Sequence, residues 1–219
     1  SGNFALTNDY IWRGMSQTGE DFAYSGGVDV SAENNGSYIG VWGSKVDFGA
    51  DDNSSYEVDA YFGYADESER GISFDTGYIS YNYPGGEDLD FEEVFLGLGY
   101  KWVGLTLSFG LDEAPNNTEW SVNFGDSGFG VTYGDYDQYG KYTLVSYDLT
   151  QTIFGFSVGI ALSEFDAEID GVPWEYESSL KLSIEKGSQS PWVLNFGLLY
   201  PFLPVIFVQP QYLLKECCP

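Results

Sequence analysis

Histidine is absent from this chain of 219 residues, and basic residues are scarce. Without histidine, the commonest general base and the commonest metal ligand are missing, and hydrolytic triads that pair serine or cysteine with histidine are excluded. Only 8 lysines and arginines stand against 34 aspartates and glutamates, so the formal net charge is −26. This acidic excess argues against nucleic acid as a partner, because its phosphates would be repelled, and favours cations, basic partners or simple solubility.

Cysteine is nearly absent as well. Cys217 and Cys218 are adjacent at the far end, where they are poorly placed to pair with each other and fit no zinc spacing. The rest of the chain therefore carries no information on redox compartment. No secretory leader is recognisable before the strand-like opening Ser1-Gly2-Asn3-Phe4, so we expect a mature form.

Aromatic residues and glycine, by contrast, are abundant. Aromatics make up 18% of the chain, with 18 tyrosines, and there are 28 glycines. Strands rich in tyrosine and glycine are typical of outer-membrane barrels, in which aromatics form girdles at the membrane interfaces and glycine occupies crowded interior positions.

Residues 56–64 show the clearest alternation of period two, which predicts a strand. One face would carry Tyr56, Val58, Ala60, Phe62 and Tyr64, and the other Glu57, Asp59, Tyr61 and Gly63. A soluble sandwich would bury the apolar face in its core. A transmembrane barrel would turn it toward lipid and the acidic face toward a watery lumen.

The remaining chain favours the barrel. We expect an all-β, antiparallel transmembrane β-barrel of about 12 strands over residues 1–186. The expected strands are 4–15, 22–31, 38–48, 56–64, 71–83, 93–102, 105–111, 118–124, 129–136, 141–150, 154–163 and 174–185. Tight turns follow strands two, four, six, eight and ten, and longer loops follow one, three, five, seven and eleven, with 137–140 left open. Short turns at one end and longer loops at the other are typical of outer-membrane barrels.

Charge is expected almost only on the inward face. The candidate lumen and selectivity residues are Asp9, Arg13, Asp29, Glu57, Asp59, Asp75, Glu93, Lys101, Glu175, Glu177 and Lys181, with Lys45 and Glu185 in the same face pattern. Fixed negative charge in a narrow pore attracts cations, whereas carboxylates that hydrogen-bond across a filled lumen would leave no pore. For Arg13, a structural ion pair with Asp9, Asp29 or Asp59 is the simpler interpretation, and a role in selectivity is the alternative.

No catalytic or metal site emerges. Asp166, Glu168, Asp170 and Glu177 have the spacing of a calcium loop, but flanking helices are missing, so a hairpin loop is the simpler interpretation and calcium only an alternative. Acidic loops at 51–53 and 87–90 could hold divalent cations that bridge lipopolysaccharide, or could simply be solvated. The alternation explains the paired carboxylates better than glycosidase chemistry does. We expect no cofactor and no enzymatic activity.

The run Asn8-Asp9-Tyr10-Ile11-Trp12-Arg13-Gly14-Met15-Ser16-Gln17-Thr18 resembles the opening signature of the TorF family of porins from Gram-negative bacteria. Segments 36–44, 57–64 and 75–85 resemble later segments of that family in the same order. The resemblance is specific over residues 3–102 and looser to about residue 186. It implies a bacterial outer-membrane barrel and, less directly, a channel.

Residues 187–219 depart from this pattern. They form a largely uncharged stretch in which Pro191, Pro201, Pro204 and Pro210 argue against a regular spanning helix. An appended segment, a plug and additional strands all stay open.

The sequence thus predicts a monomeric outer-membrane barrel, in contact with lipid and lipopolysaccharide, that passes small solutes by diffusion and prefers cations. The alternatives are a closed-lumen barrel whose acidic loops bind divalent cations or partners, and a soluble acidic β-protein.

Overall fold

The computed structural model describes residues 1–219 apart from 33–34, 50–52, 154–155, 169–178 and 189–219. Its elements are β1 (Gly2–Thr7), β2 (Ile11–Trp12), β3 (Met15–Ser16), β4 (Ala23–Ser31), β5 (Ser37–Lys45), β6 (Tyr56–Glu67), β7 (Ile72–Asn82), β8 (Phe91–Tyr100), β9 (Val103–Gly110), β10 (Asn117–Asn123), the short 3₁₀ helix η1 (Gly125–Ser127), β11 (Phe129–Tyr136), β12 (Gly140–Ile153), β13 (Phe156–Ala167) and β14 (Ser179–Ser188). Within these described residues, no helix is long and apolar enough to cross a membrane.

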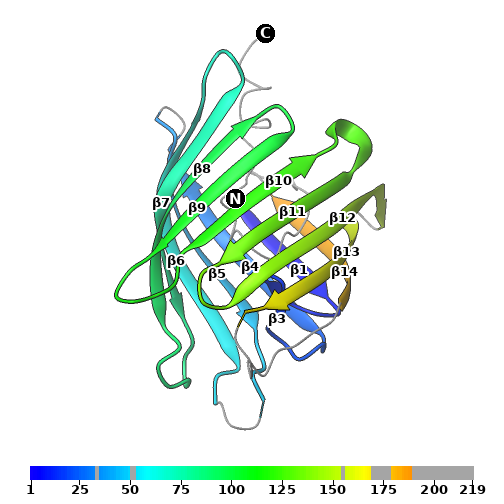
Figure 1. The fold of residues 1–219 in the computed structure, drawn as a ribbon. Coiled ribbons are helices and arrows are strands. Elements are labelled where there is room, and N and C mark those ends of the chain that lie inside the picture. The colour runs from blue at the N-terminus through cyan, green and yellow to red at the C-terminus, as the bar shows by residue number, and fades with distance from the viewer. Residues whose placement is uncertain (33–34, 50–52, 154–155, 169–178, 189–219) are drawn as a thin grey trace.

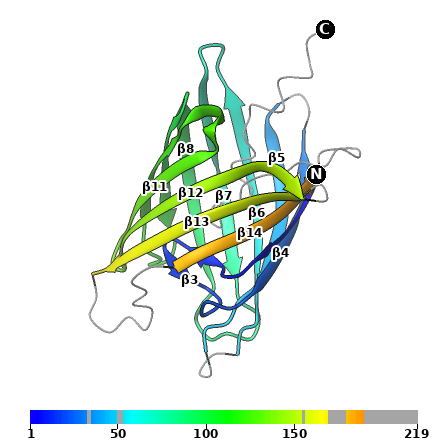
Figure 2. The same cartoon turned by 90° about the vertical axis from the view of Figure 1, so that its right-hand side faces the viewer.

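The strands form a closed antiparallel barrel (Figures 1 and 2). Each strand pairs with its neighbours in sequence from β4 to β14, and β1 closes the ring between β14 and β4. Gly2, for example, lies opposite both Ser188 on β14 and Val28 on β4. Together with β1, strands β4 to β14 make 12 strands among the described residues, which confirms the predicted fold class.

The alternation in β6 places its two faces as the sequence predicts. Phe62 is 56% exposed on the outside, whereas its neighbour Tyr61 is 2% exposed on the inside. Apolar side chains face outward around the ring on nearly every strand, among them Phe4, Val28, Val30, Ile39, Val41, Leu98, Phe109, Trp120, Tyr133, Ile160 and Leu162. The apolar flanks therefore do not pack against one another across a dry centre, as they would in two stacked sheets.

Connection lengths follow the predicted alternation from β4 to β10. The turns after β4, β6, β8 and β10 lie at one end of the barrel, and the longer connections after β5, β7 and β9 lie at the other (Figure 1). The connection after β11, which the sequence left open, is a short turn of residues 137–139. We call the two ends the tight-turn end and the long-loop end.

The first strand is shorter than predicted, and the prediction that it continues to Met15 is wrong. β1 ends at Thr7, and residues 8–22 fold into the barrel from the long-loop end before β4 begins. We call this segment the inner hairpin. Its side chains explain the difference, since a strand over 4–15 would place Tyr10 and Trp12 on the outer face with Phe4, whereas both are buried inside.

The far boundary of the barrel lies slightly beyond the prediction. β14 ends at Ser188 rather than near residue 186. The predictions for 189–219 fall outside the described residues.

Candidate functional site

The inner hairpin is built around a two-residue turn. Ile11 lies opposite Ser16 and Trp12 opposite Met15, which leaves Arg13 and Gly14 as the turn. Both have positive φ, 47° at Arg13 and 82° at Gly14. Positive φ at both central residues is the type I′ geometry that matches the twist of a tight hairpin.

Asp9 fixes the base of the hairpin. One oxygen of its carboxylate accepts hydrogen bonds from the Ser16 hydroxyl at 2.6 Å and from the Thr18 hydroxyl at 3.1 Å. The Thr18 oxygen in turn accepts from the backbone N–H of Tyr10 at 3.0 Å. These buried hydrogen bonds link both sides of the hairpin, so the segment holds its own shape inside the barrel, although the second Asp9 oxygen has no partner among the described residues.

Arg13 reaches from the hairpin to the barrel wall. Its guanidinium donates to both carboxylate oxygens of Glu93 on β8, at 2.7 and 2.8 Å. The two side chains are 4% and 1% exposed. The guanidinium also lies over the rings of Trp12 and Tyr136, 4.3 and 4.6 Å from their centroids. A bidentate ion pair with cation–π contacts on its flanks is a strong, directional anchor.

Gly14 contacts a different part of the wall. A Cβ added there would lie 2.5 Å from the Cβ of Tyr142 on β12 and 3.0 Å from the ring of Phe165 on β13. The Ser163 hydroxyl on β13 donates to the Gly14 carbonyl at 3.4 Å. The turn therefore spans the lumen, with Arg13 bound to β8 and Gly14 packed on β12 and β13.

Aromatic rings fill the space between hairpin and wall. Trp12 meets Tyr81, Phe91 and Tyr136 edge-on, at centroid distances of 6.0, 5.8 and 5.3 Å. Further buried members of the same cluster come from β5, β6, β7, β8, β12 and β13, namely Trp42, Tyr61, Ile79, Phe95, Tyr142 and Phe165. At this level the barrel contains a packed core.

Six of the predicted lumen carboxylates are buried inside, namely Asp9, Asp29, Glu57, Asp59, Asp75 and Glu93. They do not form one cluster. Asp29 accepts from Tyr61, and Asp75 accepts from Tyr38 at 2.7 Å. Glu57 accepts from Tyr83 at 3.2 Å and lies, with Asp59 and Glu93, near the inner hairpin.

The predicted partner of Arg13 is wrong. Arg13 binds Glu93 rather than Asp9, Asp29 or Asp59, because the hairpin turns it toward β8. Among the described residues, Arg13 is the only base that is buried. Four of the interior acids each keep one buried carboxylate oxygen without a hydrogen-bond partner in the described part of the chain, namely Asp9, Glu57, Asp59 and Asp75. The described interior thus has more carboxyl groups than its single base can pair.

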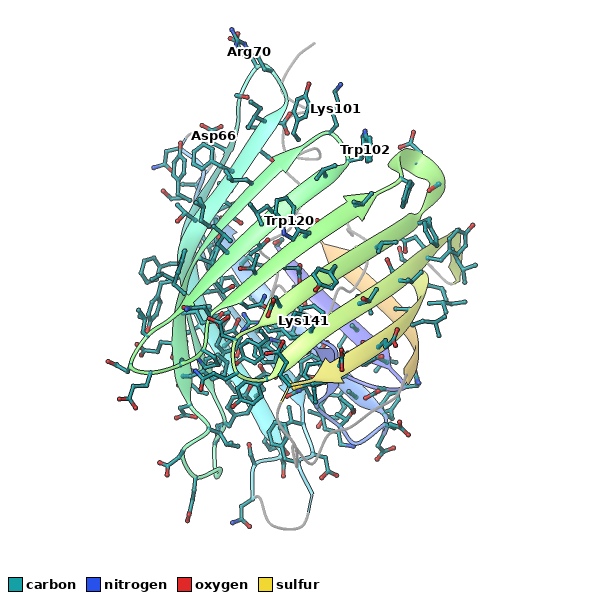
Figure 3. All side chains as sticks on the ribbon, viewed as in Figure 1. Asp66, Arg70, Lys101, Trp102, Trp120 and Lys141 are labelled. Carbon is teal, nitrogen blue, oxygen red and sulfur yellow. The ribbon has the colours of Figure 1, made fainter. Side chains whose placement is uncertain are left out.

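Lys101 does not lie among the interior residues, contrary to the prediction. It is exposed in the turn between β8 and β9, at the tight-turn end, with its ammonium 5.0 Å from the Tyr100 ring centroid (Figure 3). Lys45 lies near the other end and pairs with Asp21 at 3.3 Å. That ammonium and the backbone N–H of Phe22 lower the pKa of the exposed Asp21 carboxyl, with the N–H contributing most.

The remaining candidates are exposed or lie outside the described residues. Asp166 and Glu168 are exposed, and Glu168 binds Lys141. Asp170, Glu175 and Glu177 fall outside the described residues, and so does the side chain of Lys181, whose backbone lies in β14. In the part of the chain that the structure describes, no group of three or more acidic or cysteine side chains is placed to hold a metal ion.

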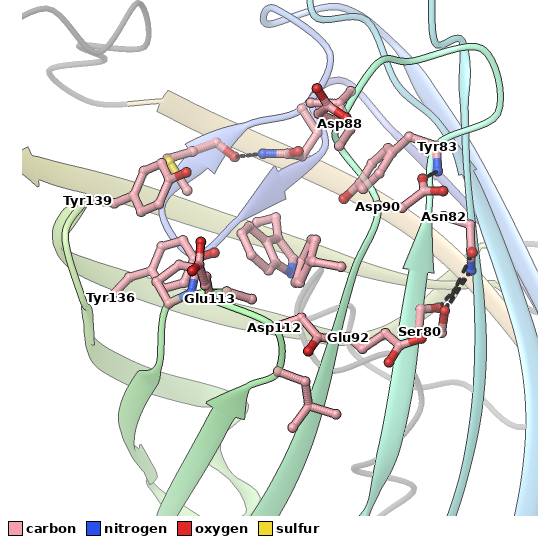
Figure 4. Close-up of a pocket in the computed structure, with 18 of the residues that line it drawn as sticks. Ser80, Asn82, Tyr83, Asp88, Asp90, Glu92, Asp112, Glu113, Tyr136 and Tyr139 are labelled. Atoms are coloured by element: carbon pink, nitrogen blue, oxygen red, sulfur yellow. Dashed lines mark hydrogen bonds between the residues drawn. The ribbon is translucent and has the colours of Figure 1, made fainter.

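On its long-loop side, the inner hairpin borders a cavity of about 840 Å³ that is open to solvent (Figure 4). Trp12, Met15 and Gln17 of the hairpin belong to its lining. The lining residues outside the hairpin come from the β5–β6 connection (Phe48), from β7, β8 and their connecting loop, from the β9–β10 loop and from residues 136 and 139. We call this cavity the vestibule.

A family model described as "Bacterial protein of unknown function (Gcw_chp)" matches residues 1–119, which is more than half of the chain. The chain belongs to this bacterial family. The Gcw_chp match contains the whole inner hairpin and its anchor Glu93, and it overlaps the segment with the resemblance to TorF porins.

No curated protein matches the chain. Among solved structures, the crystal structure of Acinetobacter baumannii OccAB3 aligns with a TM-score of 0.37 and 14% identity, over 82% of this chain and 58% of that one. The chain therefore spans little more than half the length of that protein. This similarity is too low to indicate the fold, which is established by the strand pairing described above.

Sequence reasoning missed the inner hairpin and the vestibule. The turn pair Arg13-Gly14 is an unusual one, because Asn or Asp is the common partner of glycine in a type I′ turn. One signal was available: Asp9, Ser16 and Thr18 supply short polar side chains on both sides of an apolar pair, as a self-bonded hairpin requires.

Proposed function

We propose that the chain is an outer-membrane β-barrel that its own inner hairpin closes to passive diffusion, and that it acts as an interaction barrel at the membrane surface. The observation that carries this proposal is the buried ion pair of Arg13 with Glu93 across the lumen. Opening the lumen would separate the Arg13 guanidinium from the Glu93 carboxylate and leave each charged group without its partner. Breaking a buried pair by removing one partner typically costs about 3–5 kcal/mol.

The membrane location is supported by the two faces of the wall. Apolar side chains face outward around the barrel, and the carboxylates of Glu57, Asp59 and Glu93 face inward. A charged residue on a lipid-facing strand position near mid-bilayer costs about 2–4 kcal/mol for Arg or Lys, so this segregation is what lipid selects. The expected surroundings are lipid and, around the outer loops, lipopolysaccharide, with the barrel as a monomer.

A second candidate, a cation-preferring channel, depends on the same hairpin. If residues 8–22 left the lumen, Arg13 would leave with them, and the wall carboxylates Glu57, Asp59 and Glu93 would remain without a buried base among the described residues. Fixed negative charge of this kind favours cations over anions. The chain would then conduct only in a state with the hairpin displaced.

Single-channel recording in planar bilayers tests both candidates. The full chain is expected to give no conductance steps, and a variant in which a Gly-Ser linker replaces residues 10–17 is expected to conduct. Its reversal potential in a KCl gradient should have the sign of a cation-selective pore. A control with the same kind of replacement at residues 112–115 is expected to stay silent, because the hairpin is intact.

Two outcomes would contradict the proposal. Regular conductance steps from the full chain would show that the hairpin does not close the lumen. A silent hairpin-replaced variant, with the circular dichroism of an intact barrel, would show that something else closes it and would remove the channel candidate.

A further inference from the structure

The vestibule has the size of a ligand site. Its volume of about 840 Å³ lies in the range of pockets that hold small molecules or a few peptide residues. Its lining joins the inner hairpin to segments far away in sequence, including Tyr83 after β7 and Tyr136 at the end of β11. Figure 4 shows these two tyrosines on opposite sides of the cavity.

Carboxylates border the vestibule without bases to balance them. Four acidic residues of the long loops are in its lining, namely Asp88, Asp90, Asp112 and Glu113, and among the described lining residues there is no lysine or arginine. Among the described residues, none of the four forms an ion pair. Asp90 accepts a hydrogen bond from the backbone N–H of Tyr83 at 2.7 Å, which fixes its position. All four are exposed at the mouth of the cavity, where their negative charge attracts cations.

Aromatic rings make up much of the remaining wall. Six aromatic residues are in the lining, namely Trp12, Phe48, Tyr83, Phe91, Tyr136 and Tyr139. Tyr136 and Tyr139 stack with their ring centroids 4.8 Å apart, and Phe48 meets Tyr83 edge-on at 5.7 Å. Aromatic faces attract guanidinium and ammonium groups and also cover the apolar stems of such groups. A small inorganic ion would use the carboxylates but leave the rings without a role.

The vestibule lining also contains a donor without an acceptor. Trp12 is 6% exposed, and its indole N–H has no hydrogen-bond partner among the described residues. An indole nitrogen can only donate, and a buried donor left without a partner costs free energy. The nitrogen itself is sealed from the cavity, so Trp12 contributes its ring to the lining rather than a donor to a ligand.

We propose that the vestibule binds a basic peptide segment, with an arginine or lysine side chain between the carboxylates and the aromatic rings. The cationic head lies among the four acids, and the apolar stem packs on the rings. This inference uses the hairpin as part of the binding site and does not require the lumen to be closed to ions.

The test uses two probes of the same shape. N-acetyl-arginine amide carries one positive charge and several carbonyl acceptors, and N-acetyl-citrulline amide replaces the guanidinium by a neutral urea. Isothermal titration of the purified full chain in a non-ionic detergent should show the arginine probe binding about tenfold more tightly, a factor typical of a partly desolvated charge contact. Equal affinity for the two probes, or no binding of either at millimolar concentration, would overturn the proposal.

Matched variants locate the site. The double variant Asp112→Asn, Glu113→Gln should weaken the arginine probe about five- to tenfold and leave the citrulline probe unchanged. The control Glu67→Gln, Glu69→Gln removes the same charge at the tight-turn end and should change neither affinity. Equal weakening by both pairs would mean that overall charge, not the vestibule, attracts the probe, and would refute the site.

Bilayer recordings on the same preparations test the closed-lumen proposal independently. A barrel with an open lumen can still bind the arginine probe, and a barrel with a closed lumen can fail to bind it.

Discussion

The ring of Tyr61 occupies the place that a side chain would take at Gly40, its direct partner on β5. A Cβ at Gly40 would lie 2.4 Å from the Tyr61 ring and hydroxyl. The same relationship joins Tyr142 to Gly134, where an added Cβ would lie 2.0 Å from the ring. Glycine on the inner wall thus gives tyrosine the room to lie across the neighbouring strand and reach interior carboxylates such as Asp29.

Substitution of Gly40 by alanine is therefore expected to destabilise the barrel by about 1–3 kcal/mol, the usual cost of forcing atoms into a packed core. Urea unfolding of the barrel in phospholipid vesicles measures the difference. The control Gly2→Ala meets only a backbone oxygen at 3.6 Å and should change stability by less than about 0.5 kcal/mol. Equal stability of the two variants would mean that Tyr61 moves aside without cost.

Removal of the Arg13 side chain should be more damaging than any loss of an exposed ion pair. Arg13→Ala leaves Glu93 buried and uncompensated, so we expect a loss of about 3–5 kcal/mol in the free energy of unfolding. The double variant Arg13→Met, Glu93→Gln removes both charges and should recover most of that loss. The measurement is again urea unfolding in vesicles.

The matched control is the pair of Lys45 with Asp21, which is partly exposed. Lys45→Ala should cost no more than about 1 kcal/mol. If Arg13→Ala were as mild as this control, the inner hairpin would be held by packing alone and the ion pair would not be its anchor.

The same exposed pair gives a pH dependence with a defined sign. Because the folded state lowers the pKa of Asp21 from 3.8, the carboxylate contributes stability above that value and loses it as the pH falls through the lowered pKa. The stability difference between the full chain and Asp21→Asn should therefore be small at neutral pH and shrink further below pH 3.8. A difference that grew on acidification would contradict this assignment.

The wall of the barrel could be predicted from the sequence because it depends on local alternation. Residues 129–136 were expected as a strand, and β11 has these bounds. The faces of β6 were also correct, since a period of two assigns each residue without knowledge of its partners. The prediction of these strands requires only residues that are close together in the sequence.

The interior could not be predicted, because its contacts join distant positions. Arg13 and Glu93 are 80 residues apart, and Gly14 and Ser163 are 149 apart. The alternation over residues 8–15 fits a continuation of the first strand equally well. The pattern therefore could not distinguish a strand of the barrel wall from a hairpin inside the barrel. The vestibule is harder still to predict, because it exists only where that hairpin meets loops from four other parts of the chain.

Substitutions at two glycines of the inner hairpin distinguish the effect of backbone strain from the effect of contact with the barrel wall. Gly14 and Gly19 both have positive φ, 82° and 59°, but an added Cβ meets Tyr142 at 2.5 Å in the first case and nothing within 4 Å in the second. Gly19→Ala should cost about 1 kcal/mol from strain alone. Gly14→Ala adds a clash with the wall and should displace the turn, so the amides of residues 11–16 should exchange hydrogen for deuterium at least tenfold faster than in the full chain. Equal exchange in the two variants would show that Gly14 is required only for its backbone conformation and that the packing of the turn on β12 and β13 does not hold the hairpin in the lumen.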